Sequence, residues 1–134
     1  MKKSRLLVVD DDPMILELLV TRLEIAGYRV TTARDGHEAL KRIADGHPHA
    51  MILDVNMPRL DGFSVLRHLK SAGRITTLPV MVLTARYQAS DVQEAILLGA
   101  KDFLAKPFKD NQLFLRVERL LRSSPQPADN FAFI

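Results

Sequence analysis

The chain has 134 residues, of which 47% are hydrophobic and 26% charged, and this composition suits one domain with a core of its own. A formal net charge of +3 is too small a basic excess to predict that this domain binds nucleic acid. The absence of cysteine excludes disulfides, thiolate zinc sites and cysteine nucleophiles. No apolar run approaches the roughly 18 residues of a membrane span, so we expect a cytoplasmic protein without membrane contact.

Short runs rich in aliphatic and β-branched residues alternate with longer segments whose apolar residues recur at helical spacing. In chain order, the predicted elements are a strand at 5–9, a helix at 13–27, a strand at 28–33, a helix at 35–46, a strand at 50–55, a helix at 63–73, a strand at 79–85, a helix at 88–100, a strand at 102–106 and a helix at 110–123. This alternation implies right-handed crossovers and a parallel sheet covered on both faces. The predicted fold class is α/β, a doubly wound parallel sheet of five strands in the order 2-1-3-4-5 with five flanking helices.

Polar residues stand where the predicted strands end. Asp10 and Asp11 follow the first strand, Asp54 lies near the end of the third, Thr84 of the fourth and Lys106 of the fifth. In open α/β sheets, ligands bind outside the carboxyl ends of the strands, at the point where the strand order reverses. In the order 2-1-3-4-5 this point lies between the first and third strands, so the three aspartates are expected to converge there.

Three neighbouring carboxylates repel one another unless water or a cation holds them. An oxygen-only site suits Mg²⁺ better than Zn²⁺, because the sequence arranges no dedicated histidine or cysteine set. An aspartate beside such an ion can attack phosphorus and form an acyl phosphate. Lys106 would add a second positive charge and Thr84 a hydroxyl donor, which completes the groups that phosphoryl transfer requires.

Four segments at these strand ends resemble the receiver domain of two-component response regulators. In order along the chain they read VVDDD, LDVNMPRLDG, VLTA and GAKDFLAKPF. The resemblance covers about residues 4–122, which we predict to form the receiver domain with a flavodoxin-like fold. Residues 123–134 are predicted to be a linker or C-terminal tail, and the alternative is a segment that packs back on the domain or begins a second one.

The resemblance implies that Asp54 is the phosphoacceptor, with a sensor histidine kinase or a histidine phosphotransfer protein as the donor. Asp11 and Asp54 would ligate Mg²⁺ directly, together with the backbone carbonyl of Asn56, and Mn²⁺ could substitute for Mg²⁺. Asp10 would act mainly through bound water. Asn56 and Arg86 resemble the positions that tune the lifetime of the acyl phosphate.

The resemblance also implies a switch. Thr84 matches the hydroxyl that moves toward the phosphoryl group, and Phe103 matches an aromatic position that is tyrosine in many members. Lys106 and Pro107 match a lysine and proline joined by a cis peptide bond. Phosphorylation adds a charge of roughly −1.5 to −2, and the expected readout is a changed surface for a homodimer or an output partner. That surface is formed by the last two predicted helices, 88–100 and 110–123, and the strand between them.

Several other polar residues are predicted to be structural. Asp12 is expected to cap the helix that begins at Pro13, and Asp61 with Gly62 to form a turn and a cap for the following helix. His47 and His49 are expected in a solvated turn rather than in a metal site.

Two other functional classes use similar chemistry. An aspartyl-phosphate hydrolase would present a D-x-D pair and a cap for its substrate, which the short chain lacks. A flavin- or nucleotide-binding module would have a glycine- or serine-rich phosphate loop after the first strand, where this chain has DDDPM. A receiver that never accepts phosphate is a third alternative, although every acceptor-site residue is present. The prediction is a signalling switch, not a turnover enzyme.

Overall fold

The computed structural model describes residues 3–57, 61–85 and 88–123. The strands are β1 (Arg5–Val9), β2 (Arg29–Ala33), β3 (Ala50–Leu53), β4 (Val80–Thr84) and β5 (Asp102–Ala105). The helices are α1 (Pro13–Ile25), α2 (Gly36–Gly46), α3 (Gly62–Ser71), α4 (Ala89–Leu97) and α5 (Asp110–Arg122). All strand pairs are parallel and the order is β2-β1-β3-β4-β5, which confirms the predicted fold.

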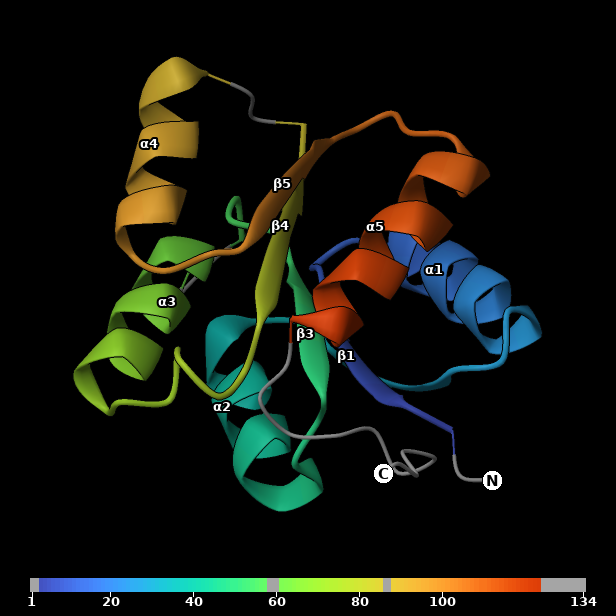
Figure 1. The fold of residues 1–134 in the computed structure, drawn as a ribbon, viewed down its shortest axis with the longest axis horizontal. Coiled ribbons are helices and arrows are strands. Elements are labelled where there is room, and N and C mark those ends of the chain that lie inside the picture. Colours follow the sequence, from blue (N-terminus) through green and yellow to red (C-terminus); the bar gives the residue numbers. More distant parts are fainter. Residues whose placement is uncertain (1–2, 58–60, 86–87, 124–134) are drawn as a thin grey trace.

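The sheet is apolar on both faces because each face is covered by helices. Side chains along a strand point alternately to the two faces, so Leu6 and Val8 of β1 belong to one core cluster, and Leu7 and Val9 to the other. In Figure 1, α1 and α5 lie on one side of the sheet, and α2, α3 and α4 on the other. The residues that α1 and α5 bury in the first cluster are Leu16, Leu19, Leu23, Leu113, Val117 and Leu120.

Local signals set the ends of the helices. The Asp12 carboxylate accepts a hydrogen bond from the Met14 N–H at 2.9 Å, which confirms the predicted cap of α1. Gly99, at φ 103°, adopts a backbone conformation that side chains disfavour, and α4 ends two residues before it, short of the predicted 100. None of the helices in the described ranges is long and apolar enough to cross a membrane.

The prediction of a solvated turn is right for His47 and wrong for His49. His47 is exposed and ends α2 in the left-handed conformation, at φ 47°. His49 is only 3% exposed, and its Nδ1 accepts the Arg5 N–H at 2.9 Å. The His49 N–H in turn donates to the Arg5 carbonyl at 2.9 Å, so the pairing of β1 with β3 draws this histidine into the fold.

Candidate functional site

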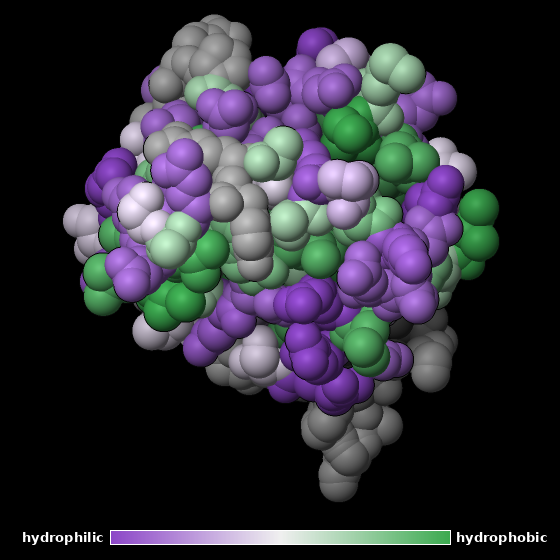
Figure 2. Space-filling model, turned by 90° about the horizontal axis from the view of Figure 1, so that it is seen from above, coloured by the Kyte–Doolittle hydropathy of each residue, from purple (hydrophilic) through white to green (hydrophobic). Residues whose placement is uncertain are grey.

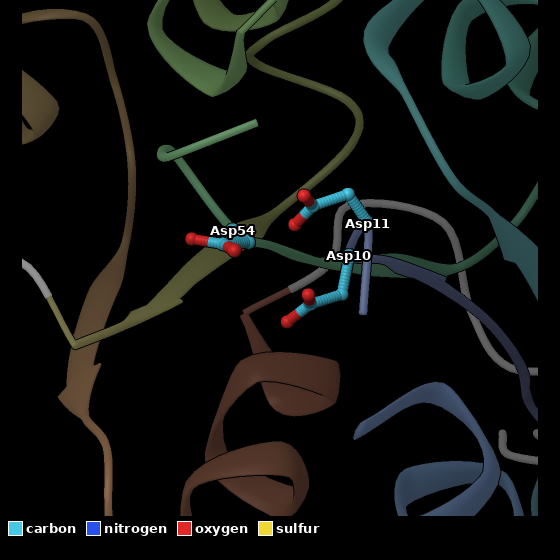
Figure 3. A group of neighbouring side chains, drawn as sticks. All are labelled: Asp10, Asp11 and Asp54. Atoms are coloured by element: carbon cyan, nitrogen blue, oxygen red, sulfur yellow. The ribbon is translucent and has the colours of Figure 1, made fainter. Parts of the chain in front are cut away.

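Three aspartates meet at the carboxyl edge of the sheet, as the sequence predicts. The Asp10 N–H donates to the Ala33 carbonyl at 3.1 Å, and the Asp54 N–H donates to the Val9 carbonyl at 2.9 Å. These bonds continue the strand ladders by one residue and fix where both side chains begin. Figure 3 shows Asp10 and Asp11 projecting from the end of β1 beside Asp54 at the end of β3. One carboxylate oxygen from each of the three residues lies within 4.8 Å of the other two.

The two buried aspartates each use one oxygen to hold the backbone beyond them. Asp10 is 2% exposed and Asp54 is 5% exposed, whereas Asp11 is more open to solvent. Oδ1 of Asp10 accepts the Asp12 N–H at 3.0 Å, and Oδ1 of Asp54 accepts the Asn56 N–H at 3.0 Å. Such local bonds from a carboxylate to the amide two residues later stabilise a turn. The second oxygen of each carboxylate therefore remains for other partners.

Lys106 supplies the positive charge of the site from the residue after β5. Its Nζ lies 2.6 Å from Oδ2 of Asp10 and 3.7 Å from Oδ2 of Asp54. The peptide bond between Lys106 and Pro107 is cis. One ammonium thus pairs with two of the three carboxylates, and the cluster keeps an excess of negative charge when all three are ionised.

The environment of Asp54 disfavours its charged form. Burial, the largest cause, raises the pKa of the Asp54 carboxyl above its ordinary value of 3.8, and the nearby Asp10 charge raises it further. The Asn56 N–H, the Lys106 ammonium and a hydrogen bond from the Thr84 hydroxyl lower it, but they do not compensate fully. A cation bound among the carboxylates would remove this imbalance.

The remaining predicted site residues occupy different surroundings. Thr84, at the end of β4, is 1% exposed and hydrogen-bonds the Asp54 side chain. Phe103 in β5 is half-buried and packs against the core cluster on the side of α2, α3 and α4. Arg86 lies outside the described residues, as do residues 124–134 of the predicted tail.

Figure 2 looks down on the edge where the strands end, and hydrophilic side chains cover much of this face. Hydrophobic side chains appear there as separate patches. One pocket near the site is lined by Ile15, Leu18, Ala85, Lys106, Pro107 and Phe108. The acidic cluster is therefore reached from an edge where charged and apolar groups lie close together.

Residues 6–118 match the family described as the response regulator receiver domain. The chain belongs to this family. Receiver domains are components of two-component signalling, in which they act as signalling domains rather than as typical turnover enzymes. Among its relatives, the response regulator MprA of Mycobacterium ulcerans is 46% identical over 128 residues, which cover 96% of this chain and 54% of that protein. The CpxR homolog of Haemophilus influenzae, a transcriptional regulatory protein, is 41% identical over 129 residues, which cover 96% of this chain and 55% of that protein.

Solved receiver structures have the same fold. The chemotaxis protein CheY4 of Vibrio cholerae matches with a TM-score of 0.83 and 32% identity, over 89% of this chain and 99% of that one. The receiver domain of the Francisella response regulator 1452 matches with a TM-score of 0.83 and 34% identity, over 90% of this chain and 98% of that one. This receiver spans about half the length of the two relatives MprA and CpxR homolog.

Sequence reasoning missed two features of the site. It assigned Lys106 to the phosphoryl group, and it did not predict that Nζ of this lysine lies nearest to Asp10, at 2.6 Å. It also treated Gly62 as part of a simple turn, whereas Gly62 lies against the backbone of Asp54. Both features depend on segments that are far apart in the chain, and no local pattern reports them.

Proposed function

We propose that this receiver domain is a phosphorylation-dependent switch that accepts a phosphoryl group from a phosphohistidine donor onto Asp54. The observation that carries the proposal is the group of three carboxylates, with oxygens within 4.8 Å of one another, beside a single lysine. Caps and turns do not require three acids to meet. In this proposal residues 4–122 form the switch, and residues 123–134 are a linker or tail.

The donor atoms of the cluster fit Mg²⁺. They are carboxylate oxygens on two neighbouring strand ends, and the described part of the site adds no thiolate or imidazole. Hard, oxygen-only sets of this kind suit Mg²⁺, and Mn²⁺ as a substitute. Asp10, Asp11 and Asp54 would hold the ion, with the backbone carbonyl of Asn56. When bound, it neutralises charge on the oxygens of the transferring phosphoryl group.

The hydrogen bonds of Asp54 indicate which of its oxygens reacts. Oδ1 accepts the Asn56 N–H, whereas Oδ2 lies 3.7 Å from Nζ of Lys106, and we assign Oδ2 as the oxygen that attacks phosphorus. In the proposed step, Oδ2 forms a bond to phosphorus while the bond between phosphorus and the donor imidazole nitrogen breaks. The imidazole leaves with the electron pair and takes up a proton. Lys106 and the Thr84 hydroxyl then face the charge of the new phosphoryl group.

We infer that the response is read at the surface formed by α4, β5 and α5, the output face. Asp102 at the start of β5 pairs with Arg116 at 2.5 Å and with Arg119 at 3.6 Å. Leu97 at the end of α4 is 74% exposed. Charged pairs and an exposed leucine on these three elements suit a surface for a second copy or an output partner. Sedimentation velocity of the phosphorylated protein against Asp54→Asn would test the second copy.

Intact-mass analysis after incubation with acetyl phosphate tests the central step. The wild type should gain about 80 Da, the mass of one phosphoryl group, and the gain should require Mg²⁺. Asp54→Asn should gain nothing. The matched control is Asp12→Asn, because Asp12 belongs to the same run of aspartates but serves as a cap that asparagine can replace. Equal mass gain in wild type and Asp54→Asn, or no gain in either, would contradict the proposal.

A further inference from the structure

Gly62, the first residue of α3, lies unusually close to the backbone of the proposed acceptor. A Cβ atom built on Gly62 would stand 2.5 Å from the Asp54 carbonyl oxygen and 2.5 Å from the Val55 Cα. Neither of these atoms belongs to a side chain that could turn away. The Gly62 N–H also donates to the Val55 carbonyl at 3.3 Å. The start of α3 therefore rests directly on the strand end that carries Asp54.

The lack of space for a side chain explains why this residue is a glycine. Its φ lies outside the left-handed region, so the backbone conformation is open to other residues. Within a helix, glycine is also less favourable than alanine because it loses more conformational freedom on folding. Glycine is used where two backbones approach closely, and here this reason applies because the conformation does not require its flexibility.

The segment from Asp54 to Asn56 is held from two sides. On one side the Asp54 N–H donates to the Val9 carbonyl of β1 at 2.9 Å, and on the other side Gly62 meets the carbonyl of the same residue. Across the turn, the Asn56 N–H donates to Oδ1 of Asp54. A shift of this backbone would therefore move the carboxylate of Asp54 and the peptide of Asn56 together.

We propose that Gly62 is a positioning residue that sets the place of the Asp54 carboxylate and the Asn56 carbonyl by allowing α3 to press on their backbone. This inference rests on the proposed function, since it concerns the geometry of the same cation and phosphoryl site. Asp61 supports the arrangement, because its Oδ1 accepts the Ser64 N–H at 2.9 Å and fixes the first turn of α3.

The first test compares Gly62→Ala with Gly46→Ala, and measures the Mg²⁺ affinity by calorimetry. Gly46 ends α2, and no atom lies within 4 Å of the place a Cβ would take. We expect Gly62→Ala to bind Mg²⁺ at least tenfold more weakly than the wild type and to gain the acetyl phosphate adduct correspondingly slowly. Gly46→Ala should match the wild type in both measurements.

A second readout requires neither metal nor phosphate. In metal-free protein, the backbone amide resonances of Asp54 and Asn56 should shift in Gly62→Ala and stay in place in Gly46→Ala. A Gly62→Ala protein that is folded at the temperature of the assay, and that has wild-type Mg²⁺ affinity and resonances, would overturn the inference. Failure of the wild type itself to bind Mg²⁺ would instead overturn the proposed function, and the metal-free resonances keep the two results distinct.

If Gly62→Ala does not fold, the Asp61 variants decide. Asp61→Asn keeps a side-chain acceptor for the Ser64 N–H, whereas Asp61→Ala removes it, and both variants lose the same charge. We expect Mg²⁺ affinity several-fold weaker in Asp61→Ala than in Asp61→Asn, because the start of α3 is no longer held against Asp54. Equal affinities in the two variants would overturn the positioning role.

Discussion

The polar groups differ between the edge of the sheet where the strands begin and the edge where they end. At the edge where β1 and β3 begin, His49 and Arg5 exchange hydrogen bonds of 2.9 Å in both directions, and the Arg5 guanidinium donates to the His47 carbonyl at 3.0 Å. At the edge where the strands end, Asp10, Asp11 and Asp54 gather, and Lys106 pairs with the first and the last of them. The first edge pairs its polar groups and stabilises the fold, whereas the second concentrates like charges.

This difference distinguishes structural polar residues, which have hydrogen-bond partners, from functional ones, which concentrate charges of the same sign. Hydrogen-bonded polar groups contribute modestly to stability and cost much when a partner is lost. Like charges held together lower stability, and they persist where a ligand uses them. Substitutions at the two edges should therefore change stability in opposite directions.

The largest effect is expected at the edge where the strands begin. His49→Ala should lower the free energy of unfolding by about 2–3 kcal/mol, because it leaves the Arg5 N–H without its acceptor and opens space in a buried position. Urea unfolding would measure the loss. The control is His68→Ala on the exposed side of α3, which should change little. Equal losses in the two variants would remove the contrast between the edges.

Mg²⁺ should stabilise the folded protein through the acidic cluster at the opposite edge. At a concentration ten times its Kd, an ion that binds only the folded protein adds about 1.4 kcal/mol. Thermal unfolding with Mg²⁺ and with EDTA would measure the gain, which His49→Ala should keep and Asp11→Asn should largely lose. A similar gain in Asp11→Asn would mean that the ion binds elsewhere.

Asp54→Asn should stabilise the metal-free protein by about 1 kcal/mol, the scale on which two like charges about 4 Å apart repel even in water. Because burial raises the pKa of the Asp54 carboxyl, the wild type loses stability as pH rises from the ordinary value of 3.8 through the raised pKa. The advantage of the variant should thus be present at neutral pH and vanish in acid. A Tm lower than that of the wild type at neutral pH would contradict this expectation.

The smallest effect concerns Tyr28, the residue directly before β2. Burial, and then the charge of Glu118, raise the pKa of its phenol above the ordinary value of 10.0. The stability that the neutral phenol contributes is complete below pH 10.0 and is lost as pH rises through the raised pKa. Tyr28→Phe should therefore lose less stability than the wild type in alkaline urea titrations. Parallel pH profiles for the two proteins would show that the phenol does not contribute.

Much of the fold follows from the sequence because its cues are local. Asp12 and Pro13 mark the start of α1, and the apolar runs mark strands that are buried on both faces. Helix ends are less accurate, as Gly99 shows, since the turn that stops α4 begins before the glycine. The burial of His49 was not predictable in this way, because its partner Arg5 is 44 residues away.

The candidate site also combines features that local sequence patterns predict with features that they do not. Asp10, Asp11 and Asp54 were predictable together because parallel strands bring their carboxyl ends to one edge. The closer pairing of Lys106 with Asp10 than with Asp54 depends on how β5 ends relative to β1, two strands that are not neighbours in the sheet. The approach of Gly62 depends on how α3 packs behind β3. Local patterns contain neither relation.

The position of β5 has a further consequence. The acids lie at the middle of the sheet, on β1 and β3, whereas β5 is the last strand and pairs only with β4 among the described strands. A central strand that shifts must break ladders on both sides, but a border strand breaks one. Phe103 thus lies on a strand with a single ladder to break, like β2 at the other border, and Lys106 directly follows β5. In the proposed switch, a change at the central strands β1 and β3 would pass to a border strand, which can shift with fewer hydrogen bonds broken.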